Sequence, residues 1–152
     1  MKKMEMEEVP NSKGIRRSFS ITVSLQEGYG ESGVVHPIEE AIKSSMEWMK
    51  ARASQGLPFI TGTFVLGQVV YAWPEGYGKA GGGSEPEIIF QGEISPLYLG
   101  NLSDEEAKLL LNNLASELGV ALGQTRVYVS YRDETWVLQT QGKKTPTGEE
   151  VK

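Results

Sequence analysis

The sequence predicts an α/β fold of the α+β class, in which a β-α-β-β unit is used twice to build one sheet with two helices on one face. Apolar and polar residues alternate strictly over Ser18–Leu25, which is typical of a half-buried strand. Two amphipathic stretches carry helix start and stop signals and begin near residues 37 and 103. The strands that follow begin near residues 59 and 125, so the two halves keep the same spacing.

The first half starts with a strand that has one apolar face and one hydroxyl face. The apolar residues are Phe19, Ile21, Val23 and Leu25, and the hydroxyl residues are Ser18, Ser20, Thr22 and Ser24. The hydroxyl face indicates that something packs closely there or that it meets water. A helix is expected between Pro37 and Gly56, which suit a helix start and a helix end. Phe59–Val65 and Gln68–Trp73 are predicted as two strands joined by a tight turn at Leu66-Gly67.

The second half follows a glycine-rich loop predicted over Pro74–Pro86. Glu87–Ser95 is predicted as a strand, and a capping box at Ser103–Glu106 marks the start of the next helix. Arg126–Tyr131 and Thr135–Gln139 are predicted as a hairpin. Together the two halves predict a ferredoxin-like double repeat, because both amphipathic helices must bury their apolar stripes against the sheet.

Length and composition favour one domain. With 152 residues, of which 39% are hydrophobic and 23% charged, the chain can bury a core of its own. We assign residues 17–140 to this domain, with pseudo-repeats over 17–73 and 86–140. Residues 1–16 are expected to form a flexible tail and residues 141–152 to be disordered, because both segments are polar and charged.

Charge and hydropathy narrow the expected partners and location. The net charge of −5 argues against a nucleic-acid partner, which needs a basic face. The sequence contains no cysteine, so disulfides are excluded. No apolar run approaches the roughly 20 residues that span a bilayer, and the amino-terminal segment lacks the apolar core of a signal peptide. We therefore expect a cytoplasmic protein without a membrane partner.

Two residues outside the last strands are weak candidates for catalysis. His36, the only histidine, lies just before the first predicted helix and could act as a general base or be an exposed or capping residue. No acidic partner for it can be identified from the sequence. Lys79 lies among the glycines of residues 76–83, which could bind a phosphate through backbone N–H groups. Their spacing matches neither a P-loop nor a dinucleotide fingerprint, so a structural loop is the better interpretation.

Four residues near the predicted strand after residue 125 could form a ligand site. Arg126, Tyr128, Ser130 and Arg132 share one face, where the arginines would supply forked donors to a small anionic ligand. Tyr128 is also a candidate for catalysis. The alternative is a water-exposed sheet face or a subunit contact. No cluster of His, Asp and Glu has metal-ligand spacing, and we expect neither a metal nor another cofactor.

The second half resembles the tautomerase superfamily, and specifically its branch of macrophage migration inhibitory factor. The matching segments are the GGGSEP run of Gly81–Pro86, the apolar strand after it, the helix from Ser103, and the RVYVSYRD run of Arg126–Asp133. The first half matches by architecture alone. The resemblance implies a homotrimer in which short strands pair across subunits. It also implies a tautomerisation site at subunit interfaces, with an amino-terminal proline as the base.

That base has no counterpart in this sequence. The sequence starts at Met1, the first strand begins near Ser18, and the nitrogen of the internal Pro10 is an amide. Tyr128 matches the family's aromatic pocket residue, whereas Ser130 stands where the family usually has asparagine. Proline-based catalysis is therefore not expected.

Two functions remain open from the sequence. The first is a tautomerase-like homotrimer that binds a small ligand or a protein partner. The second is a keto–enol tautomerase or isomerase of a small keto acid that uses a different base. Whether the chain is an enzyme is therefore left open. A trimeric signalling or metal-tolerance protein could share the βαβ repeat, but the lack of metal-ligand clusters counts against it.

Overall fold

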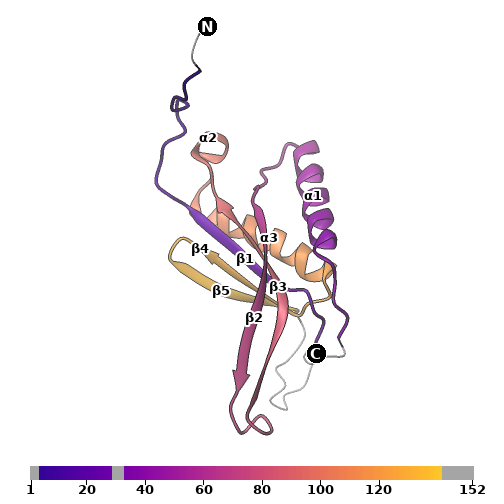
Figure 1. Cartoon of the computed structure of the whole chain (residues 1–152). Coiled ribbons are helices and arrows are strands. Elements are labelled where there is room, and N and C mark those ends of the chain that lie inside the picture. Colours follow the sequence, from indigo (N-terminus) through magenta and orange to yellow (C-terminus); the bar gives the residue numbers. More distant parts are fainter. Residues whose placement is uncertain (1–3, 29–32, 142–152) are drawn as a thin grey trace.

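The computed structural model describes residues 4–28 and 33–141 (Figure 1). In chain order the elements are β1 (Ser18–Ser24), α1 (Ile38–Ser54), β2 (Thr63–Trp73), β3 (Gly81–Glu93), α2 (Pro96–Leu99), α3 (Asp104–Ala121), β4 (Arg126–Tyr131) and β5 (Glu134–Gln139). The strands form one antiparallel sheet in the order β2-β3-β1-β4-β5. The predicted α+β class is confirmed, and so is the hairpin that ends the domain.

Helices α1 and α3 pack on the same face of the sheet, which we call the covered face (Figure 1). The apolar side chains of β1 point to this face, where Phe19, Ile21 and Val23 are buried. Burying each such side chain stabilises the fold by about 1.5–3 kcal/mol relative to leaving it in water. The hydroxyl side chains of β1 point to the opposite face, which no helix of the described residues covers. We call this the open face.

Helix α3 makes the larger helical contribution to the core. Its predicted capping box is confirmed, because Ser103 Oγ accepts from the N–H of Glu106 and Glu106 Oε1 accepts from the N–H of Ser103, both at 3.1 Å. These two bonds satisfy N–H groups that the helix itself leaves free. The buried stripe of α3 consists of Ala107, Leu110, Leu111, Leu114, Ala115, Leu118 and Gly119.

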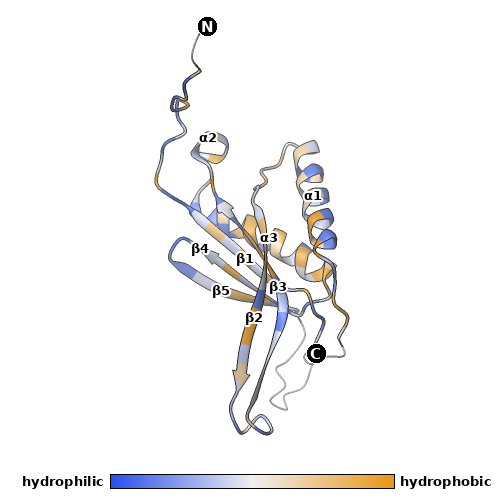
Figure 2. Cartoon of the chain, in the orientation of Figure 1, coloured by the Kyte–Doolittle hydropathy of each residue, from blue (hydrophilic) through white to orange (hydrophobic). Residues whose placement is uncertain are grey.

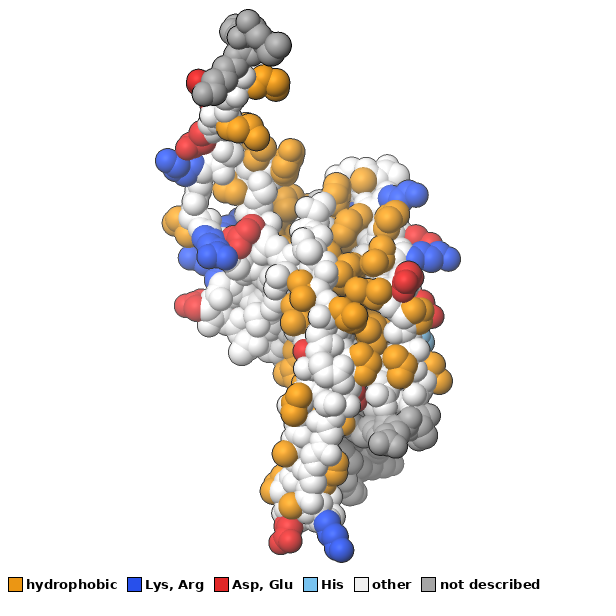
Figure 3. All heavy atoms as spheres, viewed as in Figure 1, with side chains coloured by type: hydrophobic (Ala, Val, Ile, Leu, Met, Phe, Trp, Pro, Cys, Tyr) orange, Lys and Arg blue, Asp and Glu red, His pale blue; other side chains and the backbone are white. Residues whose placement is uncertain are grey.

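Helix α1 buries a narrower stripe than α3. Trp48 is buried, and its Nε1 donates to Asn113 Oδ1 of α3 at 2.6 Å. Ala41 and Ser45 are the other buried residues of α1. The apolar residues Ile42 and Met46 are exposed, and Figure 3 shows apolar side chains gathered over this helix.

Strand β2 is continuous, so the predicted division into two strands with a turn at Leu66-Gly67 is wrong. Gly67 lies opposite Glu87 of β3, and Leu66 lies opposite Ile88. All residues of β2, Gly67 included, pair with β3, so the chain continues through Gly67 as a strand and no turn forms. The glycine costs only the side-chain packing that another residue would have supplied.

Strand β3 begins at Gly81, inside the segment predicted as a loop. Aromatic rings of β2 lie over its glycines. A Cβ atom on Gly81 would lie 2.8 Å from Trp73 Cζ2, and one on Gly83 would lie 3.2 Å from Tyr71 Oη. Glycines covered by cross-strand aromatic rings are therefore part of the sheet here, and their lack of side chains makes room for the rings.

The β2–β3 hairpin and the segment before β1 extend beyond the body of the domain (Figure 1). Figure 2 shows apolar residues along the projecting part of β2. Residues 4–16 contain no helix or strand. They belong to the tail predicted over residues 1–16, whereas the tail predicted over 141–152 falls outside the described residues except for position 141. None of the described helices is long and apolar enough to cross a membrane.

Candidate functional site

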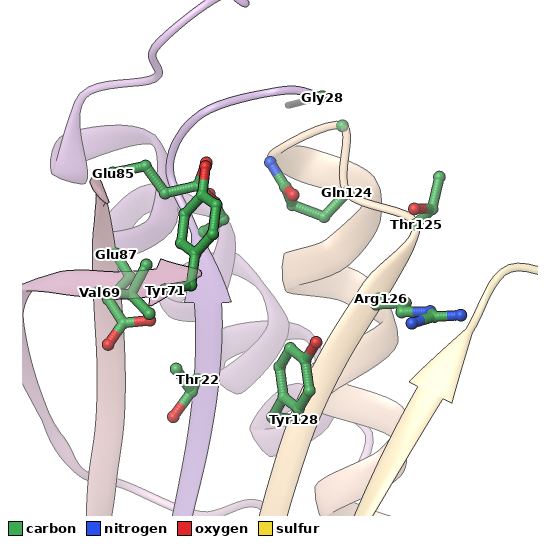
Figure 4. Close-up of a pocket in the computed structure, with 12 residues that line it drawn as sticks. Thr22, Gly28, Val69, Tyr71, Glu85, Glu87, Gln124, Thr125, Arg126 and Tyr128 are labelled. Carbon is green, nitrogen blue, oxygen red and sulfur yellow. The ribbon is translucent and has the colours of Figure 1, made fainter. Parts of the chain in front are cut away.

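A pocket with a volume of about 560 Å³ lies on the open face of the sheet (Figure 4). Its lining comes from β1, β2, β3 and β4, and from the segments that follow β1 and α3. The volume is within the range of about 300–1,000 Å³ that small-molecule sites occupy. The arrangement places residues from both halves of the sequence around one space.

The floor of the pocket is the hydroxyl face of β1, where Thr22 and Ser24 line it. Ser24 Oγ donates to Glu85 Oε1 at 2.8 Å. Glu85 is only 8% exposed, and its Oε2 has no hydrogen-bond partner among the described residues. A buried polar atom left without a partner costs about 1–3 kcal/mol. The charge of the Glu85 carboxylate would stabilise a cation in the pocket, and a hydrogen-bond donor would reach Oε2 once neighbouring side chains move aside.

A second carboxylate lies beside the first. Glu87 is two positions further along β3 than Glu85, so both side chains point to the open face. Burial raises the pKa of Glu87 above its ordinary value, and the charge of Glu85 raises it further. Arg126 also lines the pocket, but its side chain points away from the two glutamates in Figure 4. The β3 side of the pocket is therefore acidic.

Two tyrosines line opposite sides of the pocket. Tyr128 of β4 lies opposite Thr22 of β1 in the sheet register. Tyr71 of β2 lies beyond β3 on the other side, and its ring centroid is 6.0 Å from that of Trp73. Aromatic side chains bind flat ligand rings such as purines by stacking. The pocket thus combines an acidic wall with two aromatic groups.

The rim of the pocket joins the segment after β1 to the turn after α3. Gln124 Nε2 donates to the carbonyl of Gln26 at 2.9 Å. Gly123 has a φ of +63°, and a Cβ atom there would lie 2.6 Å from the carboxyl carbon of Glu27. Glycine suits this position because a residue with a side chain is strained at this positive φ, whereas the close atoms belong to the flexible end of Glu27. Gly28 completes the rim.

The structure brings Arg126 and Tyr128, but not the other two predicted ligand residues, into the pocket. Ser130 shares their face of β4, but its hydroxyl donates to β5 and it does not line the pocket. Arg132 lies in the β4–β5 turn with a φ of 55°, and its Nη1 donates to Asp104 Oδ2 at 3.3 Å. The prediction that Arg132 shares the face of Tyr128 is wrong, because the turn ends the alternation of the strand.

The other two catalytic candidates lie outside the pocket lining. Lys79 is in the loop between β2 and β3, where its carbonyl accepts from Trp73 Nε1 at 2.8 Å. His36 lies between two carboxylates, with Nε2 2.5 Å from Glu27 Oε2 and Nδ1 2.5 Å from Glu40 Oε2. Hydrogen bonds to Glu27 and then to Glu40 raise the pKa of His36 above its ordinary value.

The sequence did not single out Glu85, Glu87 or Tyr71 as ligand-binding residues. A usable signal was present for the glutamates. If the strand is started at Gly81 instead of after Pro86, its alternation places both carboxylates on the face opposite the apolar residues of the same strand. Tyr71 reaches the pocket because β2 remains paired with β3 past Gly67.

Comparisons with known proteins identify a shared fold. No protein-family model matches the chain, and no curated protein matches its sequence. A phage SAM lyase in complex with S-methyl-5′-thioadenosine has a TM-score of 0.63 and 19% identity, over 91% of this chain and 98% of that chain. A phage SAM lyase in the apo state has a TM-score of 0.62 and 20% identity, over 90% and 98%. At these identities the likeness establishes similarity of fold.

Proposed function

We propose that the chain is an enzyme similar to SAM lyase, which binds S-adenosylmethionine in the open-face pocket and converts it to S-methyl-5′-thioadenosine. The observation that carries the proposal is Glu85, whose buried Oε2 lacks a partner among the described residues in an acidic, tyrosine-flanked pocket. The similarity in fold to a lyase in complex with S-methyl-5′-thioadenosine supports the choice of ligand.

The chemistry of the pocket suits the parts of this ligand. S-adenosylmethionine carries two cationic groups, a sulfonium and an ammonium, and the carboxylates of Glu85 and Glu87 would attract them. Tyr71 and Tyr128 offer aromatic faces for the adenine ring. The amide of Gln124 and the floor hydroxyls could bond to the ribose. These charges favour a cationic ligand over the small anion predicted from the sequence.

The proposed reaction breaks the bond between sulfur and the amino-acid chain. The electron pair of this bond goes to sulfur, which becomes a neutral thioether. Two outcomes balance this step. The released carbon can form a bond to the carboxylate oxygen of the ligand's own amino-acid part, or the neighbouring carbon can lose a proton to a base so that a double bond forms. Glu87 could take that proton, because its raised pKa makes it a stronger base than an ordinary carboxylate.

Charge changes during this reaction suggest separate roles for the two carboxylates. The positive charge on sulfur disappears as the bond breaks, so a carboxylate against sulfur would stabilise the substrate more than the transition state. The ammonium group keeps its charge throughout. We therefore assign Glu85 to the ammonium group, which its carboxylate attracts without slowing the reaction, and which would bond to the buried Oε2 after neighbouring side chains move.

We also propose the homotrimer that the tautomerase resemblance implies, with the open face turned towards neighbouring copies. Val65, Tyr128 and Val137 are exposed apolar side chains on this face, and β2 and β5 are edge strands of the described sheet. Exposed apolar patches and unpaired edges are typical of surfaces that associate. Light scattering should give three times the chain mass of 16.7 kDa, and a mass of one chain would contradict the trimer. The duplicated unit and the tautomerase resemblance stay predictions.

The test is product formation from S-adenosylmethionine, measured by chromatography of S-methyl-5′-thioadenosine. We expect the wild-type chain to form it. On the route that forms a double bond, Glu87→Gln should slow it on the order of 100-fold, the usual contribution of a general base. Glu117→Gln, on the exposed side of α3, is the matched control and should keep wild-type activity. No product from the wild-type chain would contradict the proposal. Turnover of phenylpyruvate in the same samples would instead favour the tautomerase prediction.

A further inference from the structure

His36 joins two segments of the chain next to the pocket rim. Its Nε2 lies 2.5 Å from a carboxylate oxygen of Glu27, in the segment after β1, and its Nδ1 lies 2.5 Å from one of Glu40, in the first turn of α1. Carboxylates only accept hydrogen bonds, so both ring nitrogens must donate for both contacts to form. The arrangement therefore requires the doubly protonated, positively charged imidazole.

This cluster continues into the rim through backbone and side-chain contacts. The carboxylate of Glu27 lies against Gly123, and the next residue, Gly28, lines the pocket. The preceding residue, Gln26, accepts the hydrogen bond from Gln124. The N–H of His36 donates to the carbonyl of Leu25 at 2.7 Å, which keeps the imidazole beside the end of β1. Three separate segments thus meet where His36 holds Glu27.

We propose that His36 is a positioning residue for the pocket: its protonated imidazole holds Glu27 and thereby the rim, so that loss of the proton loosens the rim and weakens ligand binding. The charged groups in contact with the imidazole are Glu27 from the segment after β1 and Glu40 from α1. A neutral imidazole can donate to only one of them, and the other carboxylate then faces a ring nitrogen lone pair. The identity of the ligand rests on the proposed function, whereas the coupling of His36 to the rim does not.

The proposal predicts that ligand affinity, measured against pH, changes at two points that belong to different residues. On the acidic side, protonation of Glu87, whose pKa is raised by burial, removes one negative charge from the pocket. Deprotonation of His36, whose pKa its two carboxylate partners raise, weakens binding on the alkaline side. His36→Gln should remove the alkaline limit alone, because glutamine does not change charge over this range.

The first test needs no ligand and uses the fact that the chain has one histidine. An NMR titration follows the imidazole of His36 together with the backbone amides of Gly28, Gly123 and Gln124. We expect the amides to shift with the same midpoint as the imidazole, and to lose that transition in His36→Gln. Amides that show no transition at the His36 midpoint would overturn the coupling, whatever the pocket binds.

The second test measures binding of S-methyl-5′-thioadenosine by calorimetry across the same pH range. The wild-type affinity should fall about fivefold or more as His36 loses its proton, while the affinity of His36→Gln should stay flat there. Glu40→Gln should move the midpoint down, because it replaces one of the two carboxylates that favour the charged ring by a neutral amide. Glu39→Gln, its neighbour on α1, is the matched control and should not move it.

The two tests separate the two ideas. Amide transitions at the His36 midpoint without ligand binding at any pH would sink the proposed function and leave the coupling supported. Ligand binding with an alkaline fall that persists in His36→Gln would overturn the role of His36 and leave the proposed function in place.

Discussion

The two faces of the sheet come from the same strands and differ in what fills them. On the covered face, Ile21, Ile88 and Phe90 are 0–1% exposed and pack under the helices. On the open face, their neighbours in sequence include Thr22 and Glu87, which line a pocket. The covered face is uniform and apolar, so it stabilises the fold. The open face carries the hydroxyl, carboxylate and phenol groups that can bind a ligand.

The largest expected effect is on stability, and it compares the same substitution, isoleucine to alanine, on the two faces of the sheet. Ile88→Ala should lower the free energy of unfolding by about 2–5 kcal/mol, because it leaves a cavity in the core. Ile89→Ala on the open face is half-buried and should cost about 1 kcal/mol. Urea unfolding measures both. Equal losses would mean that the open face is as tightly packed as the covered one.

A smaller effect tests how the covered face is closed. Ser103→Ala should lower the free energy of unfolding by about 1 kcal/mol, because it removes the capping hydrogen bond at the start of α3. Ser116→Ala, at an exposed position inside the same helix, serves as the control and should change stability little or raise it slightly. If the two variants are equally stable in urea, the cap does not contribute.

Acid should weaken the contact that holds the start of α3 to the sheet. Tyr131 donates to Asp104, and this hydrogen bond, together with the charges of Arg132 and Arg17, lowers the pKa of the Asp104 carboxyl. Because the folded-state pKa is the lower one, this stabilisation is present above the ordinary value of about 3.8 and is lost as pH falls through the folded value. Urea unfolding against pH should show it, and Asp104→Asn should flatten the acid limb. If Asp104→Asn loses as much stability in acid as the wild-type chain, other carboxylates cause that loss.

The smallest effect concerns a cost built into the open face. Burial and the charge of Glu85 raise the pKa of Glu87, so its ionised form destabilises the folded chain at neutral pH. Glu87→Gln should therefore leave stability unchanged or raise it slightly while it lowers activity. Thermal unfolding with the activity assay would show this split. A clear loss of stability would mean that Glu87 supports the fold instead.

The covered face could be predicted from the sequence because its signals are local. Alternation in β1 and the capping box at Ser103 each involve residues a few positions apart, and both were confirmed. The turn expected at Gly67 was wrong, and so was the part of the expected loop that covers Gly81–Pro86, both for a non-local reason. Pairing with the partner strand, and aromatic rings from β2 over the glycines, outweigh the local preference of glycine for turns.

The site was predicted only in part because it is assembled across strands. Arg126 and Tyr128, which alternation places on one face of a strand, line the pocket, and their binding of a ligand stays a prediction. Glu85 comes from another strand, and its burial against Ser24 depends on the register between β1 and β3. The partners of His36 could not be chosen either, because nothing local in the sequence distinguishes Glu27 from the other nearby acidic residues.

The central claim is that the open face binds S-adenosylmethionine through Glu85. Steady-state kinetics on the wild-type chain and Glu85→Gln test it most directly, because the KM for S-adenosylmethionine and the inhibition constant for S-methyl-5′-thioadenosine can be measured while the substrate is consumed. S-methyl-5′-thioadenosine lacks the ammonium group, so it serves as the internal control ligand. We expect Glu85→Gln to weaken S-adenosylmethionine about tenfold or more and to change S-methyl-5′-thioadenosine much less. Equal losses for both ligands, or no binding of S-adenosylmethionine to the wild-type chain, would contradict the claim.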